Sequence, residues 1–592
     1  MNAKIKIRAR IIMTASFLLG MVLICTLYWL QVVNGETYAK KAESQYVETG
    51  TKMLNRGSIF LSAKDGTKVQ GATLKSGYKV YINPSVIPDP KVVFEALSDY
   101  VDLDEAEFMK KATKPNDKYE ELVSQVPEEK AISIRNLKII GLGVTKEIWR
   151  IYPGEGMLAH ELGLLGESAS SSVVVGKYGL ERSYENVLKR TKSTSGGYVF
   201  AQLFGDENDE EGANKNTADK SGANNSEKSL ESKQLESKEG DIITTIEPTV
   251  QKYLEKILEQ TQNKWQPEIV GGVVIDPNNG EILAMSSLPS FNPNDTRSVK
   301  NVRVFSNPLI ENAYEMGSII KPLTMATALD YGAVTPTSTY EDTGFLTLSG
   351  KKIANHDNKA RGKTTMQDLL SYSLNVGAAT IALKVGKEDF SKYFFSYGIG
   401  NKTGIDLPNE ATGIVGNLRT GRDVEIATAA YGQGIAISPI AVTKALSILA
   451  NGGYTITPHL VKEIRYSDGT NKVINIQRGG PVLKKQTTDD VTKMLVKVVD
   501  NTLLQGKIKD ERYSIAAKTG TAQMADHAKG GYYPDRYLHS FFGYFPAYNP
   551  KYLVFLFQVY PKGTEYAADT LTDPFDQITK FLINYFNIAP DR

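Results

Sequence analysis

The segment from Ile11 to Val33 has no charged residue, and it constrains the architecture of this chain more than any other feature. At about 1.5 Å rise per residue, a helix of this length spans the ~30 Å hydrocarbon core of a bilayer. Basic residues gather before the segment, which orients the N-terminus towards the cytoplasm. A cleaved signal peptide is the alternative, but its apolar part is typically only ~7 to 15 residues. We therefore predict a cytoplasmic tip (residues 1–10) and a transmembrane helix (residues 11–33).

A change in amino-acid composition divides the part of the chain that is predicted to lie outside the membrane. The segment from Gly205 to Gly240 contains no aromatic residue and only two larger aliphatic residues, Leu230 and Leu235, among Asn, Ser, Lys and Glu. Such a segment cannot bury enough apolar surface to offset its ordering entropy, which is typical of a flexible linker. The alternative is a segment that binds a partner or has a regulatory role. The predicted domains are therefore a first block (residues 34–204), a linker (residues 205–240) and a second block (residues 241–592).

Composition excludes several classes of protein. The chain is 41% hydrophobic and 23% charged, which is typical of globular proteins. A net charge of +2 gives no global electrostatic reason to bind nucleic acid. Cys25 is the only cysteine, so the sequence offers neither an intramolecular disulfide nor a cysteine-rich metal site.

The second block shows a change in hydrophobic pattern along its length. It opens with apolar runs at 270–275 and 281–285 around a Pro/Asn/Gly turn, which predicts a β-hairpin. Helical spacing follows, then β-rich segments at 513–523, 540–544 and 552–560, and finally an amphipathic helical pattern. This order predicts an α+β domain with a five-stranded antiparallel sheet, interrupted in sequence by a large helical insertion.

Several kinds of catalytic chemistry find no support in the sequence. The five histidines are scattered without metal-ligand spacing, and neither a GxSxG elbow nor a phosphate-binding loop is present. The remaining candidate nucleophile is Ser318, which has Lys321 three residues later. At the start of a helix this spacing places the two side chains on one face, where the lysine could act as the base.

Short motifs of this kind recur by chance. Ser76-Gly-Tyr-Lys79 also fits SxxK, and Lys402-Thr-Gly404 also fits the K[ST]G pattern. The discriminating feature is the ordered set of Ser318-Ile-Ile-Lys321, Ser373-Leu-Asn375 and Lys518-Thr-Gly520-Thr521, the last on a predicted strand. This order is typical of penicillin-binding proteins and class A β-lactamases.

With these motifs, the chain closely resembles the class B penicillin-binding proteins, which are membrane-anchored peptidoglycan D,D-transpeptidases. The resemblance covers almost the whole chain apart from the cytoplasmic tip and the linker. Further matching stretches are Gly271–Pro277, Tyr431-Gly-Gln-Gly434, Ser540–Gly543, Arg56-Gly-Ser-Ile59, His160–Gly163 and Gly179-Leu-Glu181.

The resemblance implies a penicilloyl-serine transferase fold, with the first block as an elongated pedestal of the dimerisation type. It also implies a role for each matched residue. Ser318 would attack the bond between the last two D-alanines of a stem peptide, and Lys321 would accept its proton. Ser373 would relay a proton to the leaving group, and Asn375 would orient the lysine and the substrate.

The third motif would bind the substrate. Lys518 would supply positive potential, Thr519 would bind the terminal carboxylate, and the N–H groups of Ser318 and Thr521 would form the oxyanion hole, with Gly520 between the two threonines. No cofactor or metal is needed. A β-lactam would acylate the same serine.

Other expectations also come from the resemblance. The protein would be a single-pass protein of the bacterial inner membrane, with its catalytic domain outside the cytoplasm. Its partners would be stem peptides, β-lactams, a membrane-embedded glycan polymerase and division-complex proteins, and no nucleic acid. The sequence context favours the cell-division (septal) branch. Three alternatives remain: an elongation-type transpeptidase, a hydrolase such as a D,D-carboxypeptidase or β-lactamase, and a non-catalytic scaffold.

Overall fold

The computed structural model describes residues 20–21, 54–168, 171–190, 238–526 and 528–592. The chain divides into two compact units, one containing Lys75–Trp149 and the other containing Arg56–Leu74 and Arg150–Arg592. The predicted transmembrane segment, residues 11–33, lies outside the described residues except for Gly20 and Met21. None of the helices in the described ranges is long and apolar enough to cross a bilayer.

The smaller unit is a helix-covered antiparallel sheet with its own core. Its elements are the C-terminal half of β2 (Lys68–Ile82), α3 (Pro90–Ser98), α4 (Glu105–Ala112), β3 (Glu120–Val126), α5 (Glu128–Asn136) and β4 (Leu142–Ile151). Asp89 and Asp104 cap α3 and α4 by accepting hydrogen bonds from backbone N–H groups. Val80 of the sheet, Leu97 of α3 and Phe108 of α4 are buried in one apolar cluster. The unit therefore has a hydrophobic core of its own.

A five-stranded antiparallel sheet in the order β16-β17-β18-β8-β9 forms the centre of the larger unit. The predicted hairpin is confirmed as β8 (Ile269–Ile275) and β9 (Ile282–Leu288), and the later strands are β16 (Ala516–Ala525), β17 (Tyr532–Phe545) and β18 (Tyr552–Val559). Seven of the eight residues of β18 are buried, as expected of a strand covered on both faces.

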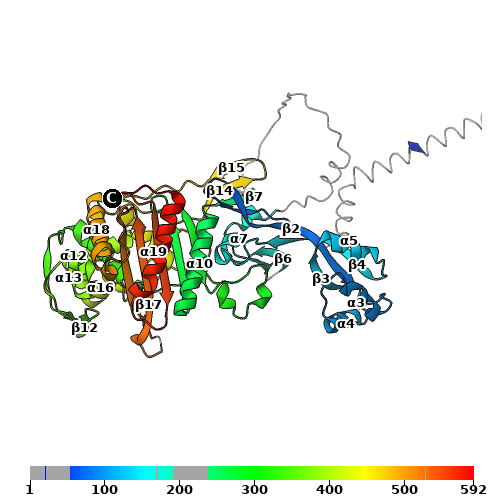
Figure 1. Cartoon of the computed structure of the whole chain (residues 1–592), viewed down its shortest axis with the longest axis horizontal. Helices are drawn as coiled ribbons and strands as arrows, with labels where there is room; N and C mark the ends of the chain where they lie inside the picture. Colours follow the sequence, from blue (N-terminus) through cyan, green and yellow to red (C-terminus); the bar gives the residue numbers. More distant parts are fainter. Residues whose placement is uncertain (1–19, 22–53, 169–170, 191–237, 527) are drawn as a thin grey trace, which may run out of the picture. The chain divides into compact units, whose positions relative to one another are not determined.

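Helices cover the two faces of this sheet. The terminal helix α19 (Ala567–Phe586) lies beside α10 (Pro248–Trp265), and both pack on the sheet (Figure 1). The helical insertion packs on the other face through α18 (Lys485–Lys497), which contacts β16. The other helices of the insertion are α11 (Lys321–Tyr331), α12 (Met366–Ser371), α13 (Asn375–Val385), α14 (Lys387–Ser396), α15 (Gly416–Thr420), α16 (Asp423–Ala429) and α17 (Pro439–Ala450). The predicted α+β arrangement with a large helical insertion is confirmed.

Short elements complete the larger unit. These are the strands β5 (Leu165–Ser168), β6 (Ser171–Gly176), β10 (Thr339–Asp342), β11 (Phe345–Leu348), β12 (Lys351–Ala354) and β13 (Gly362–Thr365), the short helices α6 (Ala159–Leu162), α7 (Gly179–Ser183) and α8 (Glu185–Leu188), and the 3₁₀ turns η2 (Thr296–Ser298), η3 (Val302–Phe305) and η4 (Gly317–Ile320). A π-helical turn, η5 (Val498–Thr502), and a 3₁₀ turn, η6 (Leu503–Gly506), connect α18 towards β16.

Part of the predicted first block packs within the larger unit. Strand β1 (Ile59–Ser62) pairs in parallel with β7 (Gly240–Thr244), and β7 pairs with β14 (Val461–Tyr466), which also pairs with β15 (Asn471–Val473). These compact units differ from the first and second blocks that were predicted from the sequence. Strand pairing between residues far apart in the chain does not affect local composition, so composition could not predict it. The predicted linker, residues 205–240, lies outside the described residues up to residue 237. The domain boundaries therefore stay a prediction.

A buried ion cluster lies within the larger unit. Glu181 is fully buried and accepts hydrogen bonds from Arg56 Nε at 2.5 Å and Arg150 Nε at 2.6 Å. Arg150 also donates to the carbonyl oxygen of Gly57 at 2.7 Å. Because a buried carboxylate needs charged partners to offset its lost hydration, this cluster holds three distant parts of the chain in one arrangement.

Candidate active site

Ser318 and Lys321 lie at the junction between η4 and α11. Gly317 has a φ of +64°, a backbone conformation that glycine adopts without strain. The following 3₁₀ turn carries Ser318, and α11 starts at Lys321. The side chain of Lys321 is fully buried, and its Nζ lies 2.9 Å from Ser318 Oγ. The predicted helix start is therefore confirmed, with a 3₁₀ turn in place of its first α-helical turn.

The backbone before Ser318 is packed tightly against β16. A Cβ atom added to Gly520 would lie 2.4 Å from Ser540 Oγ and 2.7 Å from the carbonyl oxygen of Met316. Ser540 Oγ donates a hydrogen bond to that same carbonyl at 2.8 Å. Only glycine leaves room for this approach, so Gly520 brings the Lys518–Thr521 strand alongside the turn that carries Ser318.

The second motif lies between α12 and α13 and faces the same lysine. Ser373 has a φ of +55°, which is uncommon for a residue with a side chain. Lys321 Nζ donates to the carbonyl oxygen of Ser373 at 2.6 Å and to Asn375 Oδ1 at 2.8 Å, and it lies 3.1 Å from Ser373 Oγ. Asn375 Nδ2 donates to the carbonyl oxygen of Ala354 at 2.9 Å, which fixes the orientation of the amide.

The environment of Lys321 suits an uncharged amine. Carbonyl oxygens only accept hydrogen bonds, so the two protons of a neutral amine go to Ser373 O and Asn375 Oδ1. The nitrogen lone pair then remains for a hydroxyl, and Ser318 Oγ is the nearer of the two hydroxyl oxygens. Burial, together with the positive charge of Lys518, lowers the pKa of Lys321 well below its ordinary value. Lys321 is therefore placed to accept the Ser318 proton.

Lys518 of β16 completes the group. Its Nζ donates to Ser373 Oγ at 3.1 Å and to the carbonyl oxygen of Thr519 at 2.9 Å. Burial lowers the pKa of Lys518 to about 7. Ser373 Oγ therefore lies between two amines, and the three motifs that are far apart in sequence meet at one point.

The second SxxK sequence has a different environment. Ser76 and Lys79 lie on strand β2, where residues three apart point to opposite faces. Lys79 Nζ donates to Glu121 Oε2 at 2.6 Å, and its hydrogen bond to this carboxylate helps raise the pKa of Lys79. A lysine held in its charged form has no lone pair for a serine proton, which separates this sequence from Ser318 and Lys321.

A cavity of about 910 Å³ opens above the three motifs. Predicted site residues that line it are Ser318, Ser373, Asn375, Lys518, Thr519 and Thr521, whereas Lys321 and Gly520 are packed behind it. Sequence reasoning missed the aromatic part of its wall, which consists of Tyr372, Tyr431, Tyr532, Tyr537 and Tyr566. Two of these tyrosines, Tyr532 and Tyr537, lie on β17, and the other three come from separate parts of the chain, so the set shares no sequence pattern.

Glu315 is a further residue that sequence reasoning left without a role, although it lies three residues before Ser318. Its Oε1 accepts hydrogen bonds from the N–H of Gly434 at 2.9 Å and from the hydroxyl of Tyr532 at 3.2 Å. Burial raises the pKa of Glu315. The carboxyl group thus connects the turn before Ser318 to the Gly432–Gly434 turn and to the cavity wall.

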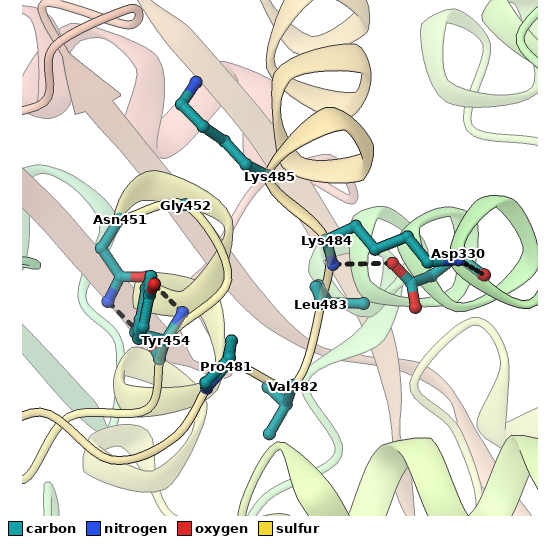
Figure 2. Close-up of a pocket in the computed structure, with 9 residues that line it drawn as sticks. All are labelled: Asp330, Asn451, Gly452, Tyr454, Pro481, Val482, Leu483, Lys484 and Lys485. Atoms are coloured by element: carbon teal, nitrogen blue, oxygen red, sulfur yellow. Dashed lines mark hydrogen bonds between the residues drawn. The ribbon is translucent and has the colours of Figure 1, made fainter.

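A separate hollow of about 520 Å³ lies elsewhere in the larger unit. Figure 2 shows its lining, which includes Asn451, Tyr454 and Lys485 and also Lys484, whose backbone N–H donates to Asp330 Oδ1 at 2.8 Å. None of the residues of the three motifs lines it. Throughout the described ranges, no group of three or more His, Cys, Asp or Glu side chains is arranged to hold a metal ion.

Comparison with known families identifies two domains along the chain, and the first of them includes residues of both compact units. The family described as the penicillin-binding protein transpeptidase domain matches residues 270–580, and the penicillin-binding protein dimerisation domain matches residues 55–224. Stage V sporulation protein D of Bacillus subtilis is 29% identical over 97% of this chain and 84% of its own length. Peptidoglycan D,D-transpeptidase FtsI of Escherichia coli is 23% identical over 98% of this chain and 91% of its own length.

Solved structures share the fold. Penicillin-binding protein 2X of Streptococcus thermophilus superimposes with a TM-score of 0.69 over 91% of this chain and 81% of its own, at 19% identity. Penicillin-binding protein 3 of Mycobacterium tuberculosis, solved in complex with aztreonam, gives 0.66 over 91% of this chain and 98% of its own, at 20% identity. Since the transpeptidase domain alone matches more than half of the residues, the chain belongs to the penicillin-binding protein transpeptidase family, in which a dimerisation domain precedes the catalytic one.

Proposed function

We propose that this protein is a serine-type peptidoglycan D,D-transpeptidase that cross-links stem peptides through an acyl-enzyme on Ser318. The observation that carries the proposal is the position of Lys321, a fully buried amine 2.9 Å from Ser318 Oγ and held by two carbonyl acceptors. A serine hydroxyl is a weak nucleophile until a base takes its proton, and no histidine contacts this hydroxyl among the described residues.

The first step is acylation. Ser318 Oγ attacks the carbonyl carbon of the penultimate D-alanine, and the hydroxyl proton passes to Lys321 Nζ. Backbone N–H groups of Ser318 and Thr521 donate hydrogen bonds to the developing oxyanion. Loss of one such donor typically costs ~3 kcal/mol in the transition state. The close packing of Gly520 against Met316 supports this role, because it brings the two backbone segments together.

Departure of the terminal D-alanine requires a proton on its nitrogen. Ser373 Oγ lies 3.1 Å from both lysine nitrogens, so it can pass the proton from Lys321 to the leaving amine while the C–N bond breaks. Lys518 and Thr519 bind the carboxylate of the leaving D-alanine, and Asn375 holds both Lys321 and the substrate amide.

The second step resolves the acyl-enzyme. An amine of a neighbouring stem peptide attacks the ester carbonyl, gives up a proton and forms the cross-link, while Ser318 regains its proton. Water attacking the same ester would give a D,D-carboxypeptidase, which is the alternative from the sequence. A β-lactam acylates Ser318 in the same way, but its leaving nitrogen stays tethered, so the enzyme remains blocked.

The proposed setting is the bacterial inner membrane, with residues 11–33 as a single transmembrane helix and the catalytic unit outside the cytoplasm. The FtsI relative supports a role in septal cross-linking, and the relative named for sporulation supports a related role during spore formation. By resemblance to the family, the proposed partners are a glycan polymerase and division proteins. Fluorescent-fusion imaging separates these roles: signal at midcell supports division, signal only in sporulating cells supports the second role, and patchy signal along the sidewall supports elongation.

Labelling with fluorescent penicillin tests the reaction. We expect the wild type to carry one label that maps to Ser318, and Ser318→Ala to carry none. Ser76→Ala is the matched control, because Ser76 belongs to the other SxxK sequence and should leave labelling unchanged. Equal labelling of Ser318→Ala would reject the proposal, and loss of the wild-type label within minutes would favour a hydrolase.

A further inference from the structure

The segment between α18 and β16 forms part of the wall of the catalytic cavity. The π-helical turn η5 ends α18, and the 3₁₀ turn η6 follows it. Val498, Thr502, Leu503, Leu504 and Gln505 from these turns line the same cavity as Ser318 and Lys518. Because π-helical turns are rare and frequently occur at functional sites, this wall is a candidate for substrate contact.

The backbone of this wall is sterically disfavoured. Leu504 has φ 46° and ψ 43°, and Gln505 has φ 57° and ψ 35°. Gly506 follows with φ +80°. Left-handed backbone crowds the Cβ atom of any residue other than glycine, and a leucine has no polar side chain to compensate locally. Leu504 and Gln505 are the only two successive non-glycine residues with positive φ in the described ranges.

Ending a helix does not require these two residues. The chain places glycine at the left-handed position that ends α11, where Gly332 has φ +85°, and at the end of α15, where Gly421 has φ +66°. Glycine at 504 and 505 would fit the same backbone without strain. Leu504 and Gln505 therefore carry side chains at a conformational cost. Residues in disfavoured backbone conformations of this kind cluster at functional sites.

The two side chains are not used by the fold. Leu503 is buried and anchors the turn, whereas Leu504 is 37% exposed and Gln505 is also exposed. Within the described residues, no hydrogen bond holds the amide of Gln505. An apolar side chain and a free amide thus line the cavity that contains the nucleophile. An apolar group contacts aliphatic carbons, and an amide pairs with peptide N–H and C=O groups.

We infer that Leu504 and Gln505 form a peptide-binding wall that contacts a stem peptide beyond its terminal D-Ala-D-Ala. The inference rests on the proposed function and adds a determinant of substrate specificity to it. The wall distinguishes a full stem peptide from smaller molecules that reach only Ser318, Lys518 and Thr519.

The test compares substrates of different length in the variant Leu504→Gly/Gln505→Gly. D-Alanine release is measured with a synthetic pentapeptide stem and with N-acetyl-D-Ala-D-Ala, and acylation with benzylpenicillin. We expect kcat/KM for the pentapeptide to fall roughly tenfold, as expected when one apolar contact and one hydrogen bond are lost. Values for the dipeptide and for benzylpenicillin should stay within about twofold, and the Tm should not fall.

Two further variants control the test. Leu504→Ala keeps a Cβ atom in the left-handed backbone but removes the apolar contact, so the pentapeptide KM should rise here too. Gln266→Gly replaces another left-handed residue, at the exposed end of α10 away from the cavity, and should leave every substrate unchanged.

The inference is overturned if the double variant turns over the pentapeptide as the wild type does. It is also overturned if the Tm, the penicillin reaction and both peptide reactions decline together, since the wall would then only support the fold. Acylation of wild-type Ser318 by benzylpenicillin reports on the proposed function separately.

Discussion

Replacing Lys518 by methionine is expected to make the protein more stable at neutral pH, although it removes a residue of the proposed site. Lys518 is 3% exposed, and burial lowers its pKa to about 7, whereas an unfolded lysine titrates near 10.4. The unfolded chain therefore binds more protons than the folded one between these two values. Folded stability is lost as the pH falls from about 10.4 to about 7, and the loss is complete below that.

The magnitude follows from the two pKa values. At pH 7 the difference corresponds to a penalty of about 4 kcal/mol on the folded state. Methionine has a similar volume and no such penalty, but it loses the hydrogen bonds to Ser373 Oγ and to the carbonyl oxygen of Thr519, each contributing about 1 kcal/mol. The variant should therefore be about 2 kcal/mol more stable at pH 7 and about 1 kcal/mol less stable at pH 10.

Equilibrium urea unfolding of the wild type and of Lys518→Met between pH 6 and pH 10 measures this crossover. Lys402→Met is the control, because Lys402 is an exposed lysine in a second Lys-Thr-Gly sequence and should give no pH-dependent difference. A variant that is destabilised by the same amount at pH 7 and at pH 10 would refute the reasoning, since Lys518 would then be charged in the folded protein.

Three other changes test separate contacts. Gly520→Ala would place a methyl group 2.4 Å from Ser540 Oγ and should slow benzylpenicillin acylation at least about tenfold, measured by stopped flow. Asn375→Asp puts a carboxylate beside Lys321, which raises the lysine pKa, so acylation should be slow at pH 7 and recover as the pH rises. Glu181→Gln leaves the buried guanidinium of Arg150 without a carboxylate and leaves Arg56 with Glu185 alone, so it should lower the free energy of unfolding by about 3–5 kcal/mol in urea titrations.

The sheet and the grouping of the motifs could be predicted from the sequence because their signals are local. Apolar runs around a Pro/Asn/Gly turn predicted β8 and β9, and the β-rich segment at 552–560 predicted strand β18. The order of the three motifs predicted one cleft, and the structure brings Ser318, Lys321 and Ser373 into contact. Residue type and spacing carry this information without any knowledge of tertiary packing.

Other features depend on tertiary packing and left no pattern to recognise. The parallel pairing of Ile59 with Ile242 joins residues far apart in sequence, so composition alone separated segments that share one compact unit. The contact of Glu315 with Tyr532 and the left-handed backbone of Leu504 are likewise invisible in local sequence. At Leu504 the residue type even favours a right-handed helical backbone, because leucine promotes α-helix.

The central claim is that Lys321 is uncharged beside Ser318 at neutral pH. The pH dependence of the Ser318 acylation rate, measured by rapid quench with benzylpenicillin from pH 5 to pH 10, tests it most directly. We predict that the rate reaches its plateau by about neutral pH, because burial and Lys518 lower the pKa of Lys321. A rate that keeps rising about tenfold per pH unit towards pH 10 would mean that Lys321 is still protonated at neutrality, and would contradict the account.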